Sequence, residues 1–283
     1  MLIKYYFPLL LTLFLAACQA SIQFPPISEQ ENPEYYPGQI IWRDLVTRDA
    51  QKAKDFYGGV FGWEFDALYK EGYQYLLVKN NGKPIAGIWG VPAKPEDSGD
   101  EWISSVSVSD VKKTLNELQP LGAESIGKVI HLKGRGTSAL IKDPEGAYIS
   151  LIKSDSGDPA NDIESNHGWI WTELWTNDLE KSKAFYQNIG YTIEQVPGQA
   201  VAYWVLKNGD QQCAAMIQNP LDNIRSLWVP YIKVANPHMI CDKVKALGGD
   251  VIMKPQENIR NGSVGICADP QGAIFAVQKY PLN

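Results

Sequence analysis

The chain has 283 residues, of which 45% are hydrophobic and 20% are charged, and its formal net charge is −6. A chain of this length holds about two domains, and this composition is typical of a globular protein. No cluster of lysine and arginine stands out against the negative balance, so nucleic acid is not an expected partner.

The first 17 residues have the pattern of a secretory signal peptide. Lys4 precedes an apolar run, Tyr5 to Ala17, which is too short for a comfortable membrane span. The run ends in Leu15-Ala16-Ala17-Cys18, which resembles the lipobox of bacterial lipoproteins. This resemblance implies cleavage before Cys18 and a lipid on Cys18 that anchors the protein in the cell envelope, and Gln19 in place of Asp favours the periplasmic side of the outer membrane. The alternative is an ordinary signal peptide with a chance cysteine.

The rest of the chain shows two stretches with the same order of elements. Residues 18–38 are rich in proline and polar residues, and we expect them to form a flexible tether. Residues 39–153 indicate a first domain, which begins with a strand at 39–47 and a helix capped by Asp49. Residues 154–167 are acidic and polar and are predicted to be a linker. Residues 168–283 indicate a second domain.

A long sequence repeat supports this division. The run W-R-D-L-V-T-R-D-A-Q-K-A-K-D-F-Y from Trp42 recurs as W-T-E-L-W-T-N-D-L-E-K-S-K-A-F-Y from Trp171, at an offset of 171 − 42 = 129. The turn sequence D-P-E-G at Asp143 recurs as D-P-Q-G at Asp269, at an offset of 126. Each copy contains two strand–helix–strands units, so the chain holds four units in all.

The chain resembles the vicinal oxygen chelate superfamily in three features. These are the four such units, the D-P-x-G sequence before the last strand, and the D-x-x-K-[AS]-K-x-F-Y sequence on the first helix. This superfamily includes glyoxalase I, bleomycin-resistance proteins and extradiol dioxygenases. The resemblance implies an α+β fold with two tandem domains. Each domain would consist of paired βαβββ modules that form a cupped, barrel-like mixed sheet with helices outside.

The resemblance also implies where a divalent metal would be bound. Enzymes of the family hold it with His, Glu or Gln on the first and last strands of the modules. The corresponding positions here are Trp42, Ile103, Trp171, Val229, Ser150 and Ala276, with Ala86 and Cys213 counted less directly from the hairpin glycines. None of these residues is His, Glu or Gln, and we expect His131, His167 and His238 to be solvated. We therefore predict no metal site and no cofactor.

Two acidic residues, Asp44 and Glu173, are the best remaining candidates for ligand binding or catalysis. Side chains alternate along a strand, so Trp42 and Asp44 share one face, as do Trp171 and Glu173. We predict that these four residues and Ser150 line a ligand-binding cavity, in which each acid accepts a ligand N–H or O–H or acts as a general base. In the alternative, each acid is structural and caps a loop or pairs with Arg or Lys. Catalytic residues cannot be named.

Three functions are compatible with the sequence. The first is a lipid-anchored binding protein that holds a small organic molecule, the second is a glyoxalase-like lyase or dioxygenase-type enzyme, and the third is a structural protein whose cavities are filled. The sequence does not predict the oligomeric state. Cys213, Cys241 and Cys267 are either three buried small hydrophobic residues or one disulfide and a spare thiol.

Overall fold

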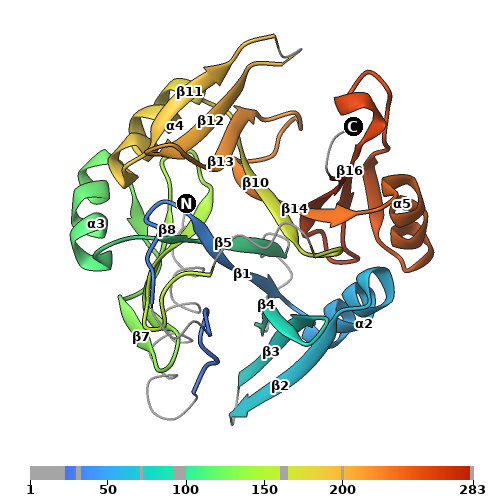
Figure 1. Cartoon of the computed structure of the whole chain (residues 1–283), viewed down its shortest axis with the longest axis horizontal. Helices are drawn as coiled ribbons and strands as arrows, with labels where there is room; N and C mark the ends of the chain where they lie inside the picture. The colour runs from blue at the N-terminus through green and yellow to red at the C-terminus, as the bar shows by residue number, and fades with distance from the viewer. Residues whose placement is uncertain are drawn as a thin grey trace, which may run out of the picture. The chain divides into compact units, whose positions relative to one another are not determined.

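The computed structural model describes residues 23–29, 33–70, 73–91, 100–159, 165–198 and 201–280, so the predicted signal peptide and Cys18 lie outside the described residues. The helices are α2 (Ala50–Phe61), α3 (Val111–Leu118), α4 (Leu179–Tyr186) and α5 (Pro237–Ala246), with short 3-10 helices η2 (Gln119–Leu121), η3 (Gln187–Ile189) and η4 (Arg260–Gly262) (Figure 1). The strands of the first half are β1 (Ile40–Thr47), β2 (Glu64–Lys70), β3 (Tyr73–Asn80), β4 (Lys83–Gly90), β5 (Glu101–Ser107), β6 (Glu124–Ser125), β7 (Ile130–Leu132), β8 (Gly136–Lys142) and β9 (Tyr148–Ser154). Those of the second half are β10 (Trp169–Thr176), β11 (Thr192–Val196), β12 (Tyr203–Asn208), β13 (Gln211–Gln218), β14 (Leu227–Val234), β15 (Asp250–Met253), β16 (Val264–Ala268) and β17 (Ile274–Lys279). None of the helices in these ranges is long and apolar enough to cross a bilayer.

The strands form two mixed sheets with the same topology. The strand order is β2-β3-β4-β1-β5-β9-β8-β6 in one sheet, where β7 also pairs with β8, and β11-β12-β13-β10-β14-β17-β16-β15 in the other. The first strand of each module runs parallel to the last, as in β1 with β4, and the hairpins within each module are antiparallel. This arrangement confirms the predicted α+β fold of two tandem domains built from βαβββ modules.

The hydrophobic cores divide the chain differently from the sequence repeat. Of the described residues, those up to 42 and those within 104–159 and 173–228 form unit 1, and those within 43–103, 160–172 and 229–283 form unit 2. The core of unit 1 brings α3, β8 and β9 together with α4, β12 and β13. The core of unit 2 brings α2, β3 and β4 together with α5, β16 and β17. Each unit therefore contains one module from each copy of the repeat.

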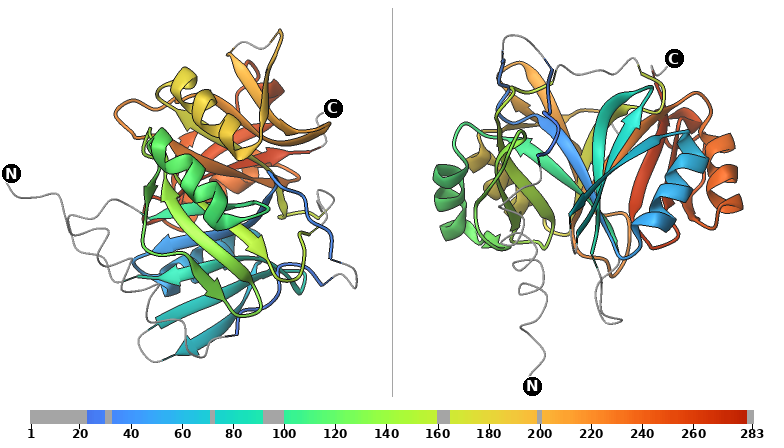
Figure 2. Two further views of the ribbon diagram at one scale, coloured as in Figure 1. Left: turned by 90° about the vertical axis from the view of Figure 1, so that its left-hand side faces the viewer. Right: turned by 90° about the horizontal axis from the view of Figure 1, so that it is seen from below.

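Each of the four helices begins after a capping side chain, as the sequence predicts for Asp49. Asp49, Asp110 and Asp178 each accept a hydrogen bond from the backbone N–H three residues on, over 2.9–3.0 Å, and Asn236 does the same over 3.2 Å. Such caps satisfy one of the free N–H groups of the first turn. In unit 2, α2 lies beside α5, and in unit 1, α3 lies beside η3, which continues α4 (Figure 2).

A buried hydrogen-bonded relay explains why two sequence motifs recur. In unit 1, the hydroxyl group of Tyr186 on α4 donates to Asp143 over 2.8 Å and accepts from Trp228 Nε1 over 3.0 Å. Asp143 also accepts the backbone N–H groups of Glu145 and Ala147, which closes the D-P-E-G turn. The relay thus ties the F-Y motif of the second repeat to the D-P-x-G motif of the first.

Unit 2 contains the same relay with the two repeats exchanged. The hydroxyl group of Tyr57 on α2 donates to Asp269 over 3.3 Å and accepts from Trp102 Nε1 over 2.8 Å. Burial raises the pKa of Asp269, as it does that of Asp143, and the hydrogen bonds to each carboxylate oppose this rise. The two relays therefore connect the modules that share each core.

The described parts of the predicted tether, residues 23–29 and 33–38, contact unit 1. Phe24 is only 1% exposed, its N–H donates to the carbonyl of Lys133 over 2.9 Å, and the guanidinium of Arg135 lies 5.1 Å from its ring centroid. The N–H of Tyr36 donates to buried Asp158 over 2.6 Å. The composition of residues 18–38 predicts a flexible linker, but its described residues 23–29 and 33–38 make contacts with unit 1 through Phe24 and Tyr36.

Candidate functional site

The first candidate acid lies in unit 2 and is bound by a tyrosine. Asp44 is on β1, directly opposite Gly87 of the parallel strand β4. The hydroxyl group of Tyr75, which is fully buried on β3, donates to Asp44 Oδ1 over 2.9 Å. The ring of Trp89 packs edge-on against Tyr75, with 4.6 Å between the centroids. Asp44 and Trp89 are only half-buried, so both side chains are partly accessible to solvent.

The second candidate acid lies in unit 1 and has the same partner type. Glu173 is on β10, directly opposite Ala215 of the parallel strand β13. The hydroxyl group of Tyr203 on β12 donates to Glu173 Oε1 over 2.9 Å, and Trp175 Nε1 donates to Oε2 over 3.4 Å. Glu173 is 0% exposed, unlike Asp44. Both repeats therefore hold an acid–tyrosine pair, one half-buried and one fully buried.

The residue opposite each acid fits the length of that acid. A Cβ atom on Gly87 would overlap with both the hydroxyl group of Tyr75 and the carboxylate of Asp44. The shorter Asp keeps its carboxylate close to its own strand, so the opposite position must lack a side chain. The longer Glu173 carries its carboxylate further out, and Ala215 is accommodated. The two copies thus reach the same pairing with different combinations of acid and small residue.

A tryptophan accompanies each pair, but on a different strand. Opposite positions on the parallel strands hold Val46 and Trp89 in the first copy, and Trp175 and Ile217 in the second. Each copy therefore presents one indole and one β-branched aliphatic residue at this level of the sheet. The indole supplies a flat apolar surface beside a carboxylate, which suits a ligand that has both a ring and an N–H or O–H group.

The other predicted site residues, Trp42, Ser150 and Trp171, lie in three different environments. Trp42 is buried in unit 1 beneath the guanidinium of Arg135, which lies 4.2 Å from its ring centroid. Ser150 shares a hydrogen bond of 2.8 Å with Ser138 and lies opposite Ser105. Trp171 is half-buried in unit 2. Of the five candidates, Trp42, Ser150 and Glu173 belong to unit 1, and Asp44 and Trp171 belong to unit 2.

Arg43, the residue before Asp44, is held on the opposite face of β1. Its Nη2 donates to Thr172 Oγ1 over 2.7 Å, and its guanidinium lies 5.0 Å from the ring centroid of Trp169. Burial lowers the pKa of Arg43 to about 9. Because neighbouring side chains on a strand point to opposite faces, Arg43 and Asp44 contribute to different environments.

The residues at the family's metal positions do not fit a divalent metal. The described ranges contain no group of three or more His, Cys, Asp or Glu residues that could hold an ion. Two of the counted positions also need correction. Ala86 points into the core of unit 2, and Cys213 is the residue skipped where the β12–β13 register shifts. The residues that face the acids are Gly87 and Ala215, and neither is a metal ligand.

The histidines behave only partly as predicted. His131 and His238 are exposed, whereas His167 is half-buried. His167 Nδ1 is 2.6 Å from the carbonyl oxygen of Phe61, and the carbonyl of His167 accepts the indole N–H of Trp63 over 2.9 Å. His167 therefore fixes the end of the predicted linker to unit 2 rather than standing in solvent.

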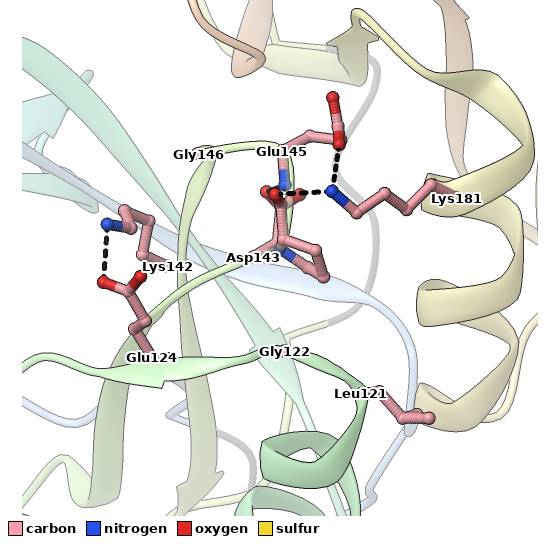
Figure 3. A pocket seen from close by; sticks show the side chains of 9 residues that line it. Leu121, Gly122, Glu124, Lys142, Asp143, Glu145, Gly146 and Lys181 are labelled. Atoms are coloured by element: carbon pink, nitrogen blue, oxygen red, sulfur yellow. Dashed lines mark hydrogen bonds and ion pairs between the residues drawn. The ribbon is translucent and has the colours of Figure 1, made fainter.

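A surface hollow of about 550 Å³ in unit 1 is lined by other residues (Figure 3). It lies around the D-P-E-G turn. Lys181 Nζ is 2.6 Å from a carboxylate oxygen of Glu145, and Lys142 Nζ is 2.5 Å from one of Glu124. Each lysine of the hollow is thus paired with a glutamate, and none of the predicted site residues lines it. We place the candidate site at the acid–tyrosine pairs, because they recur in both copies.

The tyrosines were missed by the sequence reading, although a signal for them exists. Tyr75 and Tyr203 are 128 residues apart, and so are Gly87 and Ala215, an offset that lies between the 129 and 126 of the two repeated sequences. Aligning the two copies through the hairpins would have brought out the tyrosines as recurrent polar residues on strands. It would not have shown that they touch the acids, which lie about 30 residues earlier in the chain.

The sequence is similar to a family profile and to two named proteins over most of its length. The profile of the Glyoxalase/Bleomycin resistance protein/Dioxygenase superfamily matches residues 39–151 and 169–277. The Mycobacterium tuberculosis protein CFP32, named as a candidate glyoxylase, is 31% identical over 253 residues, which cover 87% of this chain and 96% of CFP32. The anthracycline biosynthesis protein DauV of Streptomyces sp. strain C5 is 24% identical over 268 residues, which cover 87% of this chain and 96% of DauV.

A solved structure shows the same fold at low identity. The Mn(II)-bound glyoxalase from Novosphingobium aromaticivorans superposes with a TM-score of 0.57 at 12% identity, over 87% of this chain and 83% of the glyoxalase. The profile covers both copies of the repeat, and the similarity to CFP32 spans nearly its whole length. The chain therefore belongs to the Glyoxalase/Bleomycin resistance protein/Dioxygenase superfamily.

Proposed function

We propose that the chain is a lipid-anchored member of this superfamily that binds a small organic molecule without a resident metal. The observation that carries the proposal is the acid–tyrosine pair, which occupies the same place in both copies of the repeat. The fold positions an acid beside a tyrosine in each copy, and the half-buried pair of the first copy is the one that a ligand can reach.

The first copy is the better candidate for the binding site. Asp44 and Trp89 are half-buried, whereas Glu173 is enclosed, so a ligand reaches the first pair with less rearrangement. Asp44 would accept an N–H or O–H of the ligand while Tyr75 holds the carboxylate in place, and Trp89 would pack against a flat ring. DauV is named an anthracycline biosynthesis protein, and the planar ring system of an anthracycline supports a planar ligand.

The metal-free part of the proposal rests on the side chains available. Each copy supplies one carboxylate at the candidate site, and the facing positions are Gly87 and Ala215. Divalent metal sites need about three or four protein ligands. Family enzymes use a bound metal to polarise vicinal oxygens of the substrate, and we assign no such step to this chain.

The proposed anchor rests on the sequence Leu15-Ala16-Ala17-Cys18. Full-length protein expressed in a bacterium should incorporate labelled palmitate and partition with membranes, and Cys18→Ser should abolish both. Equal labelling of Cys18→Ser and wild type would contradict the lipoprotein assignment and its outer-membrane location.

An enzyme remains the alternative function, with glyoxalase-like lyase and dioxygenase-type chemistry as the candidates. The name of CFP32 favours it, and a half-buried carboxylate such as Asp44 has the chemistry of a general base. A purely structural role is favoured for the second copy, because Glu173 is fully buried and bonded to Tyr203 and Trp175.

Three measurements on purified full chain separate these functions. Elemental analysis should find no stoichiometric Zn, Ni, Fe, Mn or Mg, and turnover assays with methylglyoxal–glutathione adduct and with catechols should be negative with and without added metal. Fluorescence titration with planar aromatic compounds should find binders that Asp44→Asn weakens by about 1.5–3 kcal/mol, the value of a hydrogen bond to a charged group. Glu173→Gln is the matched control and should leave this binding unchanged. A tightly held metal or metal-dependent turnover would instead establish the enzyme.

A further inference from the structure

Two cysteines face each other in the core of unit 2. Cys241 lies on α5 and Cys267 on β16, and their Sγ atoms are 3.9 Å apart. Their exposed fractions are 3% and 0%. The third cysteine of the folded domains, Cys213, belongs to unit 1, where its Sγ lies 3.5 Å from the carbonyl oxygen of Gln211. The structure thus distinguishes a pair from a single thiol, which the sequence alone could not do.

The internal repeat shows that both members of the pair differ together from their counterparts. At the offset of 126 that relates the two D-P-x-G turns, Cys241 corresponds to Leu115 on α3 and Cys267 to Ile141 on β8. Leu115 and Ile141 are both buried in the core of unit 1. One copy therefore places two aliphatic side chains at this helix–strand contact, and the other places two thiols. A covalent link requires this joint replacement, whereas general core packing does not.

The surroundings of the sulfurs leave room for them to approach. Gly265, two residues before Cys267 on β16, has no side chain, and a Cβ atom there would come within 2.8 Å of Cys241 Sγ. A disulfide requires the sulfurs to close from 3.9 Å to about 2.05 Å. In the folded protein, the contact between the two thiols lowers the pKa of Cys241 and raises that of Cys267.

We propose that Cys241 and Cys267 form a disulfide bond when the chain matures in an oxidising compartment, and that Cys213 remains a thiol. The oxidant is a disulfide, R–S–S–R. The thiolate of Cys241 attacks one of its sulfurs and releases R–S⁻, and the thiolate of Cys267 then attacks the sulfur of Cys241 and releases the second R–S⁻. Two electrons pass to the oxidant, which becomes two thiols, and the two cysteines lose two protons. Because both sulfurs are buried, the bond forms before unit 2 closes.

The bond would close a loop that spans 26 residues of sequence and includes β15. Such a link restricts the unfolded chain, so the oxidised protein should unfold at a higher temperature than the reduced one. This proposal is independent of ligand binding at Asp44, and its failure would leave the proposed function untouched.

The experiment uses the full chain, refolded in a mixture of oxidised and reduced glutathione. Free thiols are alkylated in denaturant, and the protein is digested without reduction and analysed by mass spectrometry. We expect one cross-linked peptide pair that contains Cys241 and Cys267, and an alkylated peptide that contains Cys213. Recovery of Cys241 and Cys267 as separately alkylated peptides, or a cross-link that involves Cys213, would overturn the proposal.

The chain itself supplies the control for stability. The double variant Cys241→Leu/Cys267→Ile installs the aliphatic pair found in the other copy of the repeat, so it should fold. Its melting temperature should not respond to reductant, whereas wild type and Cys213→Ser should both melt several degrees lower when reduced. A melting temperature of wild type that is the same with and without reductant would count against the bond. The peptide map decides the matter on wild type if the double variant does not fold.

Discussion

The hydroxyl group of Tyr186 donates a hydrogen bond of 2.8 Å to the carboxylate of Asp143, although the two residues belong to different copies of the sequence repeat. The bond connects a helix of one copy to the turn before the last strand of a module in the other. Tyr57 and Asp269 make the reciprocal connection over 3.3 Å. The motifs that reveal the duplication in the sequence are thus the residues that join the modules of each unit.

Removal of the Tyr186 hydroxyl group should destabilise the protein. Tyr186→Phe leaves the indole N–H of Trp228 without its acceptor and Asp143 without one donor, and all three groups are buried. We expect a loss of about 1–3 kcal/mol in the free energy of unfolding, measured by urea titration. Tyr57→Phe is the matched control and should cost less, because its bond to Asp269 is longer. An unchanged unfolding free energy in Tyr186→Phe would contradict the relay.

The cost of Tyr186→Phe should also depend on pH. Burial raises the pKa of Asp143 above its ordinary value of 3.8, and the bond from Tyr186 opposes that rise. A carboxyl group whose folded pKa is raised favours folding when protonated, and this stability is lost as pH rises through the folded pKa. Without the Tyr186 hydroxyl the pKa rises further, so the variant should lose more stability at about pH 7 than at about pH 4. Equal losses at the two values would show that Asp143 is not the partner.

Acidification should weaken unit 2 through His167. Burial lowers the pKa of His167 below 6.5, the charge of Lys243 acts in the same direction, and the bond to the carbonyl of Phe61 opposes both. The folded state therefore disfavours the protonated imidazole, so the stability is fully present above pH 6.5 and declines as pH falls below it. Urea titrations over this range should show the decline in wild type.

The variant His167→Asn should remove most of that decline. Asn places an amide N–H close to the position of the imidazole N–H, and it tolerates the left-handed backbone of residue 167, whose φ is 61°. His131→Asn is the control, because His131 is exposed. If both variants retain the full pH dependence of wild type, another group is responsible.

Substitutions at Asp44 and at the opposite residue, Gly87, should have coupled effects on the free energy of unfolding. Gly87→Ala alone places a Cβ atom against the hydroxyl group of buried Tyr75 and should destabilise the protein by about 1–3 kcal/mol. Asp44→Glu/Gly87→Ala reproduces the Glu173 and Ala215 combination of the second copy. The double variant should recover part of the loss, and a double-mutant cycle of unfolding free energies measures this coupling. Strictly additive losses would show that the acid does not adapt to its opposite residue.

Neither half of the sequence should fold alone as a monomer. A fragment of residues 168–283 contains α4 and α5 but lacks the modules that complete the core of each unit. We expect it to unfold without cooperativity, and we expect cooperative unfolding to return when it is mixed with residues 23–159. Circular dichroism of the fragments, separately and mixed, makes the comparison. A cooperative monomeric transition in 168–283 alone would contradict the division into units 1 and 2.

The features that sequence reasoning predicted correctly are those set by local chemistry. Asp49 and Asp178 are recognisable as caps because a cap needs only the next three residues. The hairpin at Asn81 and Gly82 is similarly local, and both residues adopt positive φ. The repeat then extended these assignments to a fold, because two copies of one pattern restrict the possible topologies.

The errors arose where distant segments meet or where a strand changes register. Ala86 and Cys213 were counted from hairpin glycines, but each of the two hairpins has a register shift, at Val78/Lys79 and Leu206/Lys207, which moves the later residues relative to β1 and β10. The docking of Phe24 depends on Arg135, more than 100 residues away. No local pattern encodes such contacts.

The division of the chain between the two units determines when each hydrophobic core can form during synthesis. Residues 43–103 leave the ribosome early, but the rest of their core, residues 229–283, follows only after 229 − 103 = 126 more positions. At typical rates of synthesis this delay is about 6–25 s. Unit 1 can close as soon as residue 228 has emerged, whereas Phe56, Trp63 and Trp102 remain exposed until the later residues of their core, up to Val277, have emerged. This early, apolar stretch is where a chaperone or an export factor has the longest time to bind.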